Sequence, residues 1–393
     1  RGFRTRGHNL VWPGAVNLPQ SINDLLGEGS LDATEQQALR DAITARIAEM
    51  GAATSGKITS WDVVNEPRSN RDLLDALDEG DAAMADWFQL AAAADPNARL
   101  YVNDFGILTS GGGTDTQNQQ LLESQAQDLL DAGAPIDGVG LQGHFSDDNL
   151  TGPEQLWAIV DRYADMGLDV HVTEFDHNST DEALQAAYLR DFYTAMFAHE
   201  GVSEISMWGF WENAHWLDDA ALYRSDWSIK PNGEAYSDLV YGEWWTEEDA
   251  ATDAAGEATV RAFKGQHDVT AERAGQQVAA NATLTDGGTT LVVTLDTLVG
   301  DYNGDGTVDA ADYTMWRDAY GTAVTQNGEG ADGNADGVVN EADLALWRDA
   351  FGATMPTNAP PVPEPTGVAI LVGLAFTRLA GGRVRTPREG SAR

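Results

Sequence analysis

Residues 58–70, ITSWDVVNEPRSN, decide the fold. Their first half is apolar and rich in β-branched residues, which predicts a buried strand that ends at Asn65 and Glu66. A carboxylate at the end of a buried strand must be solvated, paired with a cation or used in chemistry. The surroundings of Glu66 therefore decide whether it is a structural or a catalytic residue.

Short apolar runs like this one alternate with amphipathic helical segments as far as about residue 245. The runs end in polar or aromatic side chains and cover residues 3–12, 58–65, 99–104, 138–144, 169–174 and 204–211. Repeated strand–helix units predict a parallel sheet, and in an eightfold α/β barrel the carboxyl ends of the strands form the active site. A complete barrel has eight units, so the sequence predicts a (β/α)8 TIM barrel that lacks about two units before Arg1.

The first long helical segment covers residues 33–51. Leu39, Ile43 and Ile47 fall on one face of this helix, and Gly51 is expected to end it.

The composition excludes several kinds of partner and chemistry. The chain has 63 acidic and 23 basic residues and a formal net charge of -40, so it should repel nucleic acid and anionic membranes. It has no cysteine, which excludes disulfides, thiolate catalysis and zinc held by cysteine. Twelve tryptophans are many for a chain of 393 residues. Such side chains often bind sugars by stacking, although most of them can also fill a core.

Glu66 and Glu174 are two carboxylates that each follow an apolar run. Glycoside hydrolysis needs two carboxyl groups that face one cleft, one protonated and one ionised. Asn65, beside the first glutamate, could donate a hydrogen bond to a sugar 2-hydroxyl. A salt bridge with a nearby arginine remains the alternative for a single glutamate of this kind.

Seven segments resemble, in order, the motifs of glycoside hydrolase family 10, the endo-β-1,4-xylanases. They are RGHNLVWP (6–13), WDVVNEP (61–67), YVNDF (101–105), GVGLQGHF (138–145), HVTEFD (171–176), MWGFWENAHW (207–216) and IKPNGEAYSDL (229–239). The resemblance implies a retaining xylanase that needs no cofactor for catalysis, with Glu66 as general acid/base and Glu174 as nucleophile. It also implies a set of substrate-binding residues around the cleavage point: His8, Trp12, Asn65, Gln142, His144, Asp176, Trp208 and Trp216. Asp176 would orient His144 toward the nucleophile.

Two departures from the family affect contacts to the substrate, and the missing strands leave other functions open. Pro13 stands where the family usually has a histidine, and the WENAHW loop (211–216) differs from the usual one. A β-1,4-glucanase is one alternative. A truncated, inactive protein that binds carbohydrate or docks to a scaffold is another.

Residues 301–321 and 332–352 form an internal repeat that resembles a type I-like dockerin. Each copy resembles a calcium loop followed by one helix, with Gly306 or Gly337 at the sharp turn. The resemblance implies two structural Ca²⁺ ions and a cohesin-like partner. The expected metal ligands are Asp301, Asn303, Asp305, Asp309 and Asp312 in the first loop, and Asp332, Asn334, Asp336, Asn340 and Asp343 in the second.

The chain therefore divides into four segments. We expect a partial catalytic barrel in residues 1–245, a linker with a small β appendage in 246–299, the calcium repeats in 300–353, and a Pro-rich linker with an apolar, Arg-rich tail in 354–393. The tail resembles a PEP-CTERM sorting signal. It implies transient membrane contact and a secreted or cell-surface protein of a Gram-negative bacterium.

Overall fold

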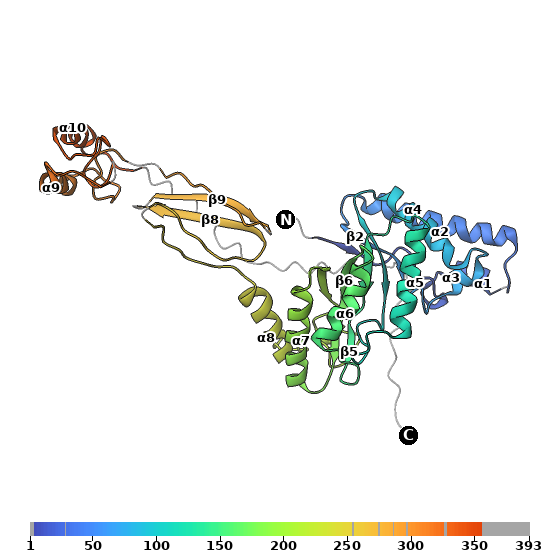
Figure 1. Cartoon of the computed structure of the whole chain (residues 1–393). Coiled ribbons are helices and arrows are strands. Elements are labelled where there is room, and N and C mark those ends of the chain that lie inside the picture. Colours follow the sequence, from blue (N-terminus) through green and yellow to red (C-terminus); the bar gives the residue numbers. More distant parts are fainter. Residues whose placement is uncertain are drawn as a thin grey trace, which may run out of the picture. The chain divides into compact units, whose positions relative to one another are not determined.

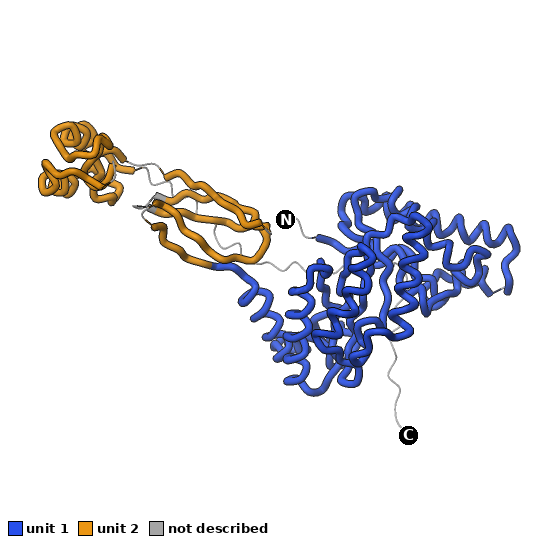
Figure 2. Tube along the Cα trace, viewed as in Figure 1, with its two compact units in different colours: residues 1–247 blue, residues 248–393 orange. Residues whose placement is uncertain are grey.

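The computed structural model describes residues 4–355, except residues 28, 254, 274–275, 286, 296–297 and 326–327. It divides into two compact units, Arg1–Glu247 and Glu248–Arg393 (Figure 2). Each unit is described by itself. From residue 356 onward, the predicted sorting tail lies outside the described residues.

A parallel sheet forms the centre of the first unit (Figure 1). Its strands are β1 (Arg6–Gly7), β2 (Ser60–Asn65), β3 (Arg99–Asp104), β4 (Gly138–Leu141), β6 (Asp169–Asn178) and β7 (Val202–Met207). They pair in the order β1-β2-β3-β4-β6-β7, and β5 (His144–Ser146) pairs with the second half of β6. Within the described residues, β1 and β7 each pair with one neighbour, so the sheet is not closed between them.

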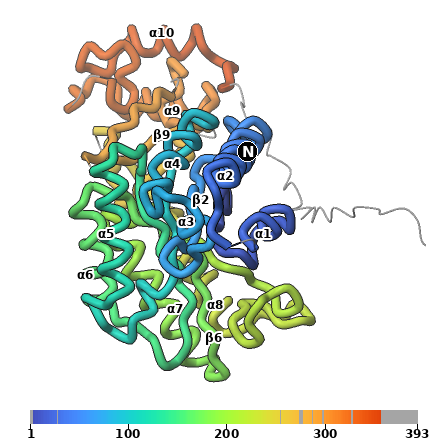
Figure 3. The backbone as a smooth tube through the Cα atoms, turned by 90° about the vertical axis from the view of Figure 1, so that its right-hand side faces the viewer, coloured from blue at the N-terminus to red at the C-terminus, as the bar shows by residue number. Residues whose placement is uncertain are grey.

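Helices lie around this sheet, as Figure 3 shows. They are α1 (Gln20–Leu26), α2 (Ala33–Thr54), α3 (Asp72–Ala76), α4 (Ala83–Ala94), α5 (Gln117–Asp131), α6 (Pro153–Ala164), α7 (Glu182–Phe197) and α8 (Pro231–Asp238). Short 3-10 turns cover Ala15–Asn17, Gly80–Ala82 and Glu212–Ala214, and a π-helical turn covers Leu239–Glu243. The alternation of strand and outer helix confirms the expected α/β barrel fold class.

Local sequence explains most of these elements. All six residues of β2 are buried, as expected for a strand covered on both faces. Helix α2 begins with a capping box between Asp32 and Glu35 and buries Leu39, Ile43 and Ile47 on one face.

The predicted stop at Gly51 is wrong, because α2 continues to Thr54. A Cβ atom at Gly51 would lie 2.4 Å from the Ala94 Cβ atom of α4. The glycine therefore allows two helices to approach closely instead of ending one of them.

Several strand bounds differ from the expected runs. The first run forms only the two residues of β1, yet Leu10 and Val11 donate backbone hydrogen bonds to Asp62 and Val63 of β2 beyond an interruption. The run 138–144 divides into β4 and the start of β5, and β6 extends four residues beyond Glu174 because β5 pairs with its second half.

The second unit contains an antiparallel hairpin and two short helices. Strands β8 (Gly265–Arg273) and β9 (Gln276–Leu284) form the hairpin. Helices α9 (Ala310–Ala319) and α10 (Glu341–Ala350) each follow one predicted calcium loop. None of the helices within residues 4–355, apart from the gaps given above, is long and apolar enough to cross a membrane.

Candidate active site

The two glutamates lie at irregular points of the parallel sheet. Glu66 follows β2, and its backbone N–H donates to the Asn103 carbonyl at 2.7 Å. Glu174 lies in β6, where the pairing with β7 shifts in register between Val172 and Phe175. Both glutamates have a positive φ, of 55° and 89°. Non-glycine residues rarely adopt this conformation, and such backbone strain concentrates at functional sites.

Side-chain amides connect the two carboxyl groups. Gln142 Nε2 donates to Glu66 Oε1 at 3.0 Å and to Asn65 Oδ1 at 3.4 Å. Asn103 Nδ2 donates to the same Asn65 oxygen at 2.8 Å and to Glu174 Oε1 at 2.9 Å. Asn65 Oδ1 therefore joins the two halves of one hydrogen-bond network, which holds both glutamates in the same site.

His144 lies between Glu174 and Asp176. Its Nδ1 lies 3.0 Å from Asp176 Oδ2, and its Nε2 lies 3.2 Å from Glu174 Oε2. Asp176 also accepts a hydrogen bond of 2.8 Å from Trp216 Nε1. These contacts fix the orientation of the imidazole against the nucleophile candidate.

His8 lies on the other side of Glu174. Its Nδ1 is 2.9 Å from Asp62 Oδ2 and 4.0 Å from Glu174 Oε1. Asp62 is fully buried and also pairs with Arg6. The buried aspartate therefore both orients His8 and is neutralised by Arg6.

Both histidines bind protons more tightly than a free imidazole. Burial opposes the charge of His144, but hydrogen bonds and the negative charges of Asp176 and Glu174 outweigh it and raise its pKa to about 9. For His8, burial also opposes protonation, yet Asp62 raises the pKa above its usual value. A proton on either ring therefore complements negative charge on the carboxylates beside it.

Three tryptophans surround the histidines. The ring centroid of Trp208 lies 5.3 Å from that of His8 and 6.4 Å from that of His144, in edge contacts. The ring centroids of Trp12 and His8 are 6.0 Å apart, and those of Trp216 and His144 are 5.0 Å apart. The structure thus gathers all ten barrel residues that the resemblance implied into one connected group.

Three further residues of this site were not among the residues predicted from the sequence. Asn103 donates to Glu174, Asp62 holds His8, and Asn70 Nδ2 donates to Glu66 Oε2 at 2.9 Å. An acidic residue inside the apolar run of β2 was a signal for Asp62, because a buried carboxylate needs a partner. Asn103 ends β3 beside Asp104, which marked it as a strand-end polar residue.

Some buried polar atoms of the site have no partner among the described residues. They include Asn65 Nδ2 and Trp12 Nε1, which are donors, and Asp176 Oδ1, which is an acceptor. An unpaired buried donor costs free energy unless a ligand or water pairs with it. These atoms therefore suit hydrogen bonds to substrate hydroxyls or ordered water.

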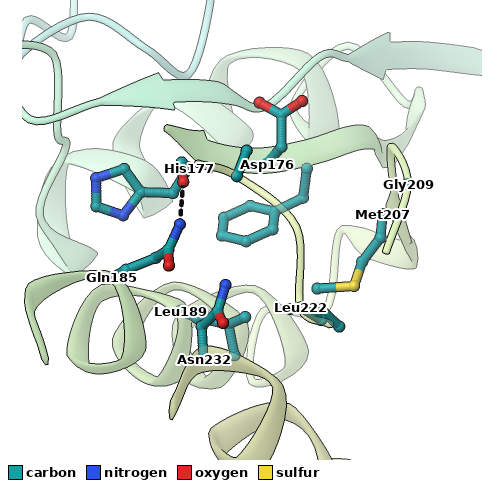
Figure 4. A pocket seen from close by; sticks show the side chains of 10 residues that line it. Asp176, His177, Gln185, Leu189, Met207, Gly209, Leu222 and Asn232 are labelled. Atoms are coloured by element: carbon teal, nitrogen blue, oxygen red, sulfur yellow. Dashed lines mark hydrogen bonds between the residues drawn. The ribbon is translucent and has the colours of Figure 1, made fainter. Parts of the chain in front are cut away.

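A cavity of about 10 Å³ lies between β6 and helices α7 and α8 (Figure 4). Phe175, Asp176 and His177 line it from the strand, and Gln185 and Asn232 line it from the helices. Gln185 Nε2 donates to the His177 carbonyl. This volume holds about one water molecule and no sugar ring, so the cavity belongs to the support of β6 and not to a binding cleft.

In the second unit, each predicted calcium loop folds around its first aspartate. Asp301 accepts hydrogen bonds from the backbone N–H groups of Asp305 at 3.1 Å and Gly306 at 2.8 Å. Asp332 does the same for Asp336 and Gly337, at 3.1 and 2.9 Å. Gly306 and Gly337 have φ values of 86° and 91°, as the sharp turn of such a loop requires.

The donor set of these loops fits a hard cation. Asp312, Asp332 and Asp343 are buried, and none of them pairs with Lys, Arg or His in the described part of the chain. Buried carboxylates without a counter-charge favour a bound cation. Within the described residues, no three or more His, Asp or Glu side chains are grouped to hold a metal ion. The expected ligands therefore have to combine carboxylates with Asn and backbone oxygens.

The two loop–helix units hold each other through reciprocal hydrogen bonds. Trp316 Nε1 of α9 donates to the Asn340 carbonyl at 2.8 Å, and Trp347 Nε1 of α10 donates to the Asp309 carbonyl at 2.7 Å. Asp309 and Asn340 cap the two helices. Each helix therefore fixes the end of the opposite loop.

A further contact breaks the symmetry of the repeat. The Tyr302 hydroxyl donates to the Asp343 carbonyl. At the equivalent position of the second loop stands Gly333, where a Cβ atom would lie 2.8 Å from the Tyr302 hydroxyl. Glycine is thus needed at this position, because the tyrosine of the first loop occupies the space.

Comparison with known proteins decides the family. Residues 1–239 match the model of glycosyl hydrolase family 10. The chain belongs to glycosyl hydrolase family 10. Residues 299–349 match the dockerin type I domain.

Proteins similar to this chain include several xylanases and an anti-sigma factor. Endo-1,4-beta-xylanase 1 of Arabidopsis thaliana is 29% identical over 268 residues, which cover 68% of this chain and 26% of the relative. The anti-sigma-I factor RsgI6 of Acetivibrio thermocellus is 30% identical over 270 residues, which cover 68% of this chain and 33% of the relative. The chain thus spans about a third or less of the length of these two relatives.

Solved structures agree on the fold. The crystal structure of xylanase 10B from Thermotoga petrophila RKU-1 in complex with xylobiose has a TM-score of 0.53 and 23% identity. The match covers 61% of this chain and 74% of that chain. At this identity, the match shows the barrel fold and not the details of the site.

Proposed function

We propose that this chain hydrolyses the internal β-1,4 bonds of xylan with retention of anomeric configuration. The observation that carries the proposal is the network in which Gln142, Asn65 and Asn103 join Glu66 to Glu174. A retaining site needs two carboxyl groups about 5–5.5 Å apart. A shared set of amide donors is a means of holding them at such a spacing.

In the first step, a carboxylate oxygen of Glu174 attacks the anomeric carbon and the bond to the leaving oxygen breaks. Glu66 gives its proton to that oxygen, so that a neutral sugar hydroxyl departs. In the second step, Glu66 takes a proton from water, the water oxygen attacks the anomeric carbon, and Glu174 is released.

The neighbouring residues serve this sequence of steps. His144, oriented by Asp176, faces the nucleophile, and His8 faces its other oxygen. Asn65 Nδ2 has no partner in the described chain and can donate to the sugar 2-hydroxyl, a bond that strengthens in the transition state. Trp12, Trp208 and Trp216 provide apolar surface against the sugar.

Hydrolysis of xylan and of carboxymethylcellulose by the full chain tests the substrate class. We expect reducing sugar from xylan, and xylo-oligosaccharides whose newly formed ends keep the β configuration by NMR. A higher rate on carboxymethylcellulose would favour the β-1,4-glucanase. Absence of hydrolysis of both, with binding of xylan retained, would favour the inactive carbohydrate-binding protein.

A second function is proposed for the dockerin type I segment. Its ten oxygen-bearing loop residues would hold two Ca²⁺ ions, which would fix the loops for docking to a cohesin-like partner. Buried Asp312, Asp332 and Asp343 without cationic partners favour this function.

Calorimetric titration of the calcium-stripped full chain should give two sites. Replacing both Asp301 and Asp305 with Ala should remove one site and leave xylan hydrolysis unchanged, because the barrel has its own core. Absence of calcium binding in the unmodified chain would refute this second function.

The dockerin type I match and the glycoside hydrolase family suit a protein that acts outside the cell or at its surface. The PEP-CTERM-like tail, its transient membrane contact, the Gram-negative source and the missing barrel units stay predictions. Fractionation of a culture that produces the protein tests the location and the membrane contact. Retention of the product in the cytoplasm would contradict the secreted location.

A further inference from the structure

An exposed group of aromatic rings lies on the chain that follows β7. The indole rings of Trp211 and Trp227 stack, with centroids 4.8 Å apart and planes inclined by 11°. The ring of Phe210 lies 6.3 Å from that of Trp227. Trp227 and Phe210 are 56% and 55% exposed. We refer to Phe210, Trp211 and Trp227 as the aromatic platform.

Trp227 occupies a strained position at the tip of a short hairpin. Tyr223 and Ile229 form an antiparallel bridge, and Trp227 N donates to the Arg224 carbonyl at 2.9 Å. Trp227 has a φ of 69°, in the left-handed region that favours glycine or asparagine. A bulky, exposed tryptophan is therefore kept where the backbone disfavours it, which is typical of functional positions.

Backbone hydrogen bonds hold the two segments of the aromatic platform together. The Phe210 carbonyl accepts from the N–H groups of Leu222 and Tyr223 at 3.1 and 2.8 Å, and Glu212 N donates to the Tyr223 carbonyl at 3.0 Å. The Glu212 side chain accepts from Ser225 N at 2.8 Å. The backbone that carries the rings is thus fixed before any ligand arrives, which lowers the entropy cost of binding.

The chain that carries the aromatic platform begins close to the catalytic site. Trp208, three residues before Trp211, contacts the rings of His8 and His144. Three residues of chain span at most about 11 Å between Cα atoms. A polymer that places one sugar between Glu66 and Glu174 must extend beyond it, so its other sugars need binding surface at such distances from the site.

We propose that the aromatic platform binds a further sugar ring of the β-1,4-linked chain, stacked on Trp227 outside the catalytic centre. The faces of a pyranose carry C–H groups, which match the negative face of an indole, while its hydroxyls remain free at the ring edge. Nucleic-acid bases also stack on tryptophan, but the net charge of -40 repels a phosphate backbone. The proposal rests on the proposed function, since it needs a polysaccharide in the cleft.

The substitution Trp227→Gly distinguishes a purely structural role of Trp227 from sugar binding. If Trp227 only covers Trp211, then Trp227→Gly uncovers apolar surface and lowers stability without changing substrate binding. If Trp227 binds sugar, the same substitution weakens binding. Glycine also relieves the strain of the positive φ, so the fold itself should tolerate it.

The test compares substrates of two lengths in the full chain. For xylohexaose, Trp227→Gly should lower kcat/KM about tenfold, a loss in the range of one stacked ring. For an aryl β-xylobioside, which reaches less of the cleft, the change should stay below about twofold. Trp245→Gly is the matched control, because Trp245 is 64% exposed and lies outside the aromatic platform. This control should leave kcat/KM unchanged for both substrates.

A binding measurement separates this proposal from the proposed function. Xylohexaose is titrated by calorimetry into Glu174→Gln and into the double variant that also carries Trp227→Gly, which should bind about tenfold more weakly. If the unmodified chain hydrolyses neither substrate, the proposed function fails, and this titration still judges the aromatic platform. Equal binding by both variants, or equal kinetic losses on both substrates, overturns the proposal.

Discussion

Replacement of Asp176 by Asn should lower the proton affinity of His144. In the unmodified protein, burial opposes protonation of His144, but Asp176 and Glu174 together raise its pKa from 6.5 to about 9. Asp176 Oδ2 lies 3.0 Å from Nδ1. Loss of its charge should lower the pKa of His144 by roughly one to two pH units, the usual effect of one close charge.

The same contacts link stability to pH. Because the folded pKa of His144 is raised, its protonation stabilises the folded protein fully below pH 6.5, and this contribution is lost as pH rises toward 9. A difference of about 2.5 pH units corresponds to roughly 3 kcal/mol. This value is an upper bound, because 20% of the His144 side chain is exposed and water screens it.

Histidine-selective ¹⁵N NMR can follow this titration, because the chain has seven histidines. Asp147→Asn is the matched control, since Asp147 Oδ1 contacts His177 Nε2 at 3.0 Å and this variant removes the same charge elsewhere. It should leave His144 unchanged. A pKa near 6.5 for His144 in the unmodified protein, or no response to Asp176→Asn, would refute the reasoning.

Two other substitutions test separate parts of the molecule. Glu66→Ala should slow release of a sugar from xylan far more than release of a good aryl leaving group in the first step, because only the sugar needs a proton; equal losses in pre-steady-state kinetics would count against Glu66 as the acid. Trp347→Phe should remove the hydrogen bond to Asp309, cost about 1 kcal/mol of unfolding free energy in calcium, and weaken calcium binding by the loop of Asp309. If denaturant unfolding and calcium calorimetry are both unchanged, the two loop–helix units of the repeat do not stabilise each other.

The fold class could be predicted because the apolar runs repeat. The run 99–104 coincides with β3, and the ten barrel residues implied by the family motifs lie in one site. Strand-end position alone already placed Glu66 and Glu174 at one edge of the sheet. The order of strands and helices and the candidate catalytic residues could therefore be predicted from the sequence.

Features that depend on contacts between distant segments could not be predicted. Gly51 has a helix-ending residue type, yet Ala94 of another helix explains its presence inside α2. The division of the run 138–144 follows from the pairing of β5 with β6. The strained φ values of Glu66 and Glu174 also follow from tertiary structure, because nothing in the residue type glutamate favours them.

Contacts between the two copies of the repeat could not be predicted from the sequence either. The period of 31 residues predicted two equivalent loop–helix units. It could not show that Trp316 and Trp347 each bind the opposite loop, or that Gly333 makes room for Tyr302. Such contacts can be seen only when the positions of both loop–helix units in space are known.

Rescue of Glu174→Ala by azide tests the central claim most directly. The substitution removes the nucleophile and leaves space for a small anion beside His144, which contacts Glu174 at 3.2 Å. With an aryl β-xylobioside, we expect loss of turnover, partial recovery in azide, and an α-xylobiosyl azide of inverted configuration by NMR. Near-normal turnover without azide, or a β-configured azide, would contradict Glu174 as the nucleophile of a retaining hydrolase.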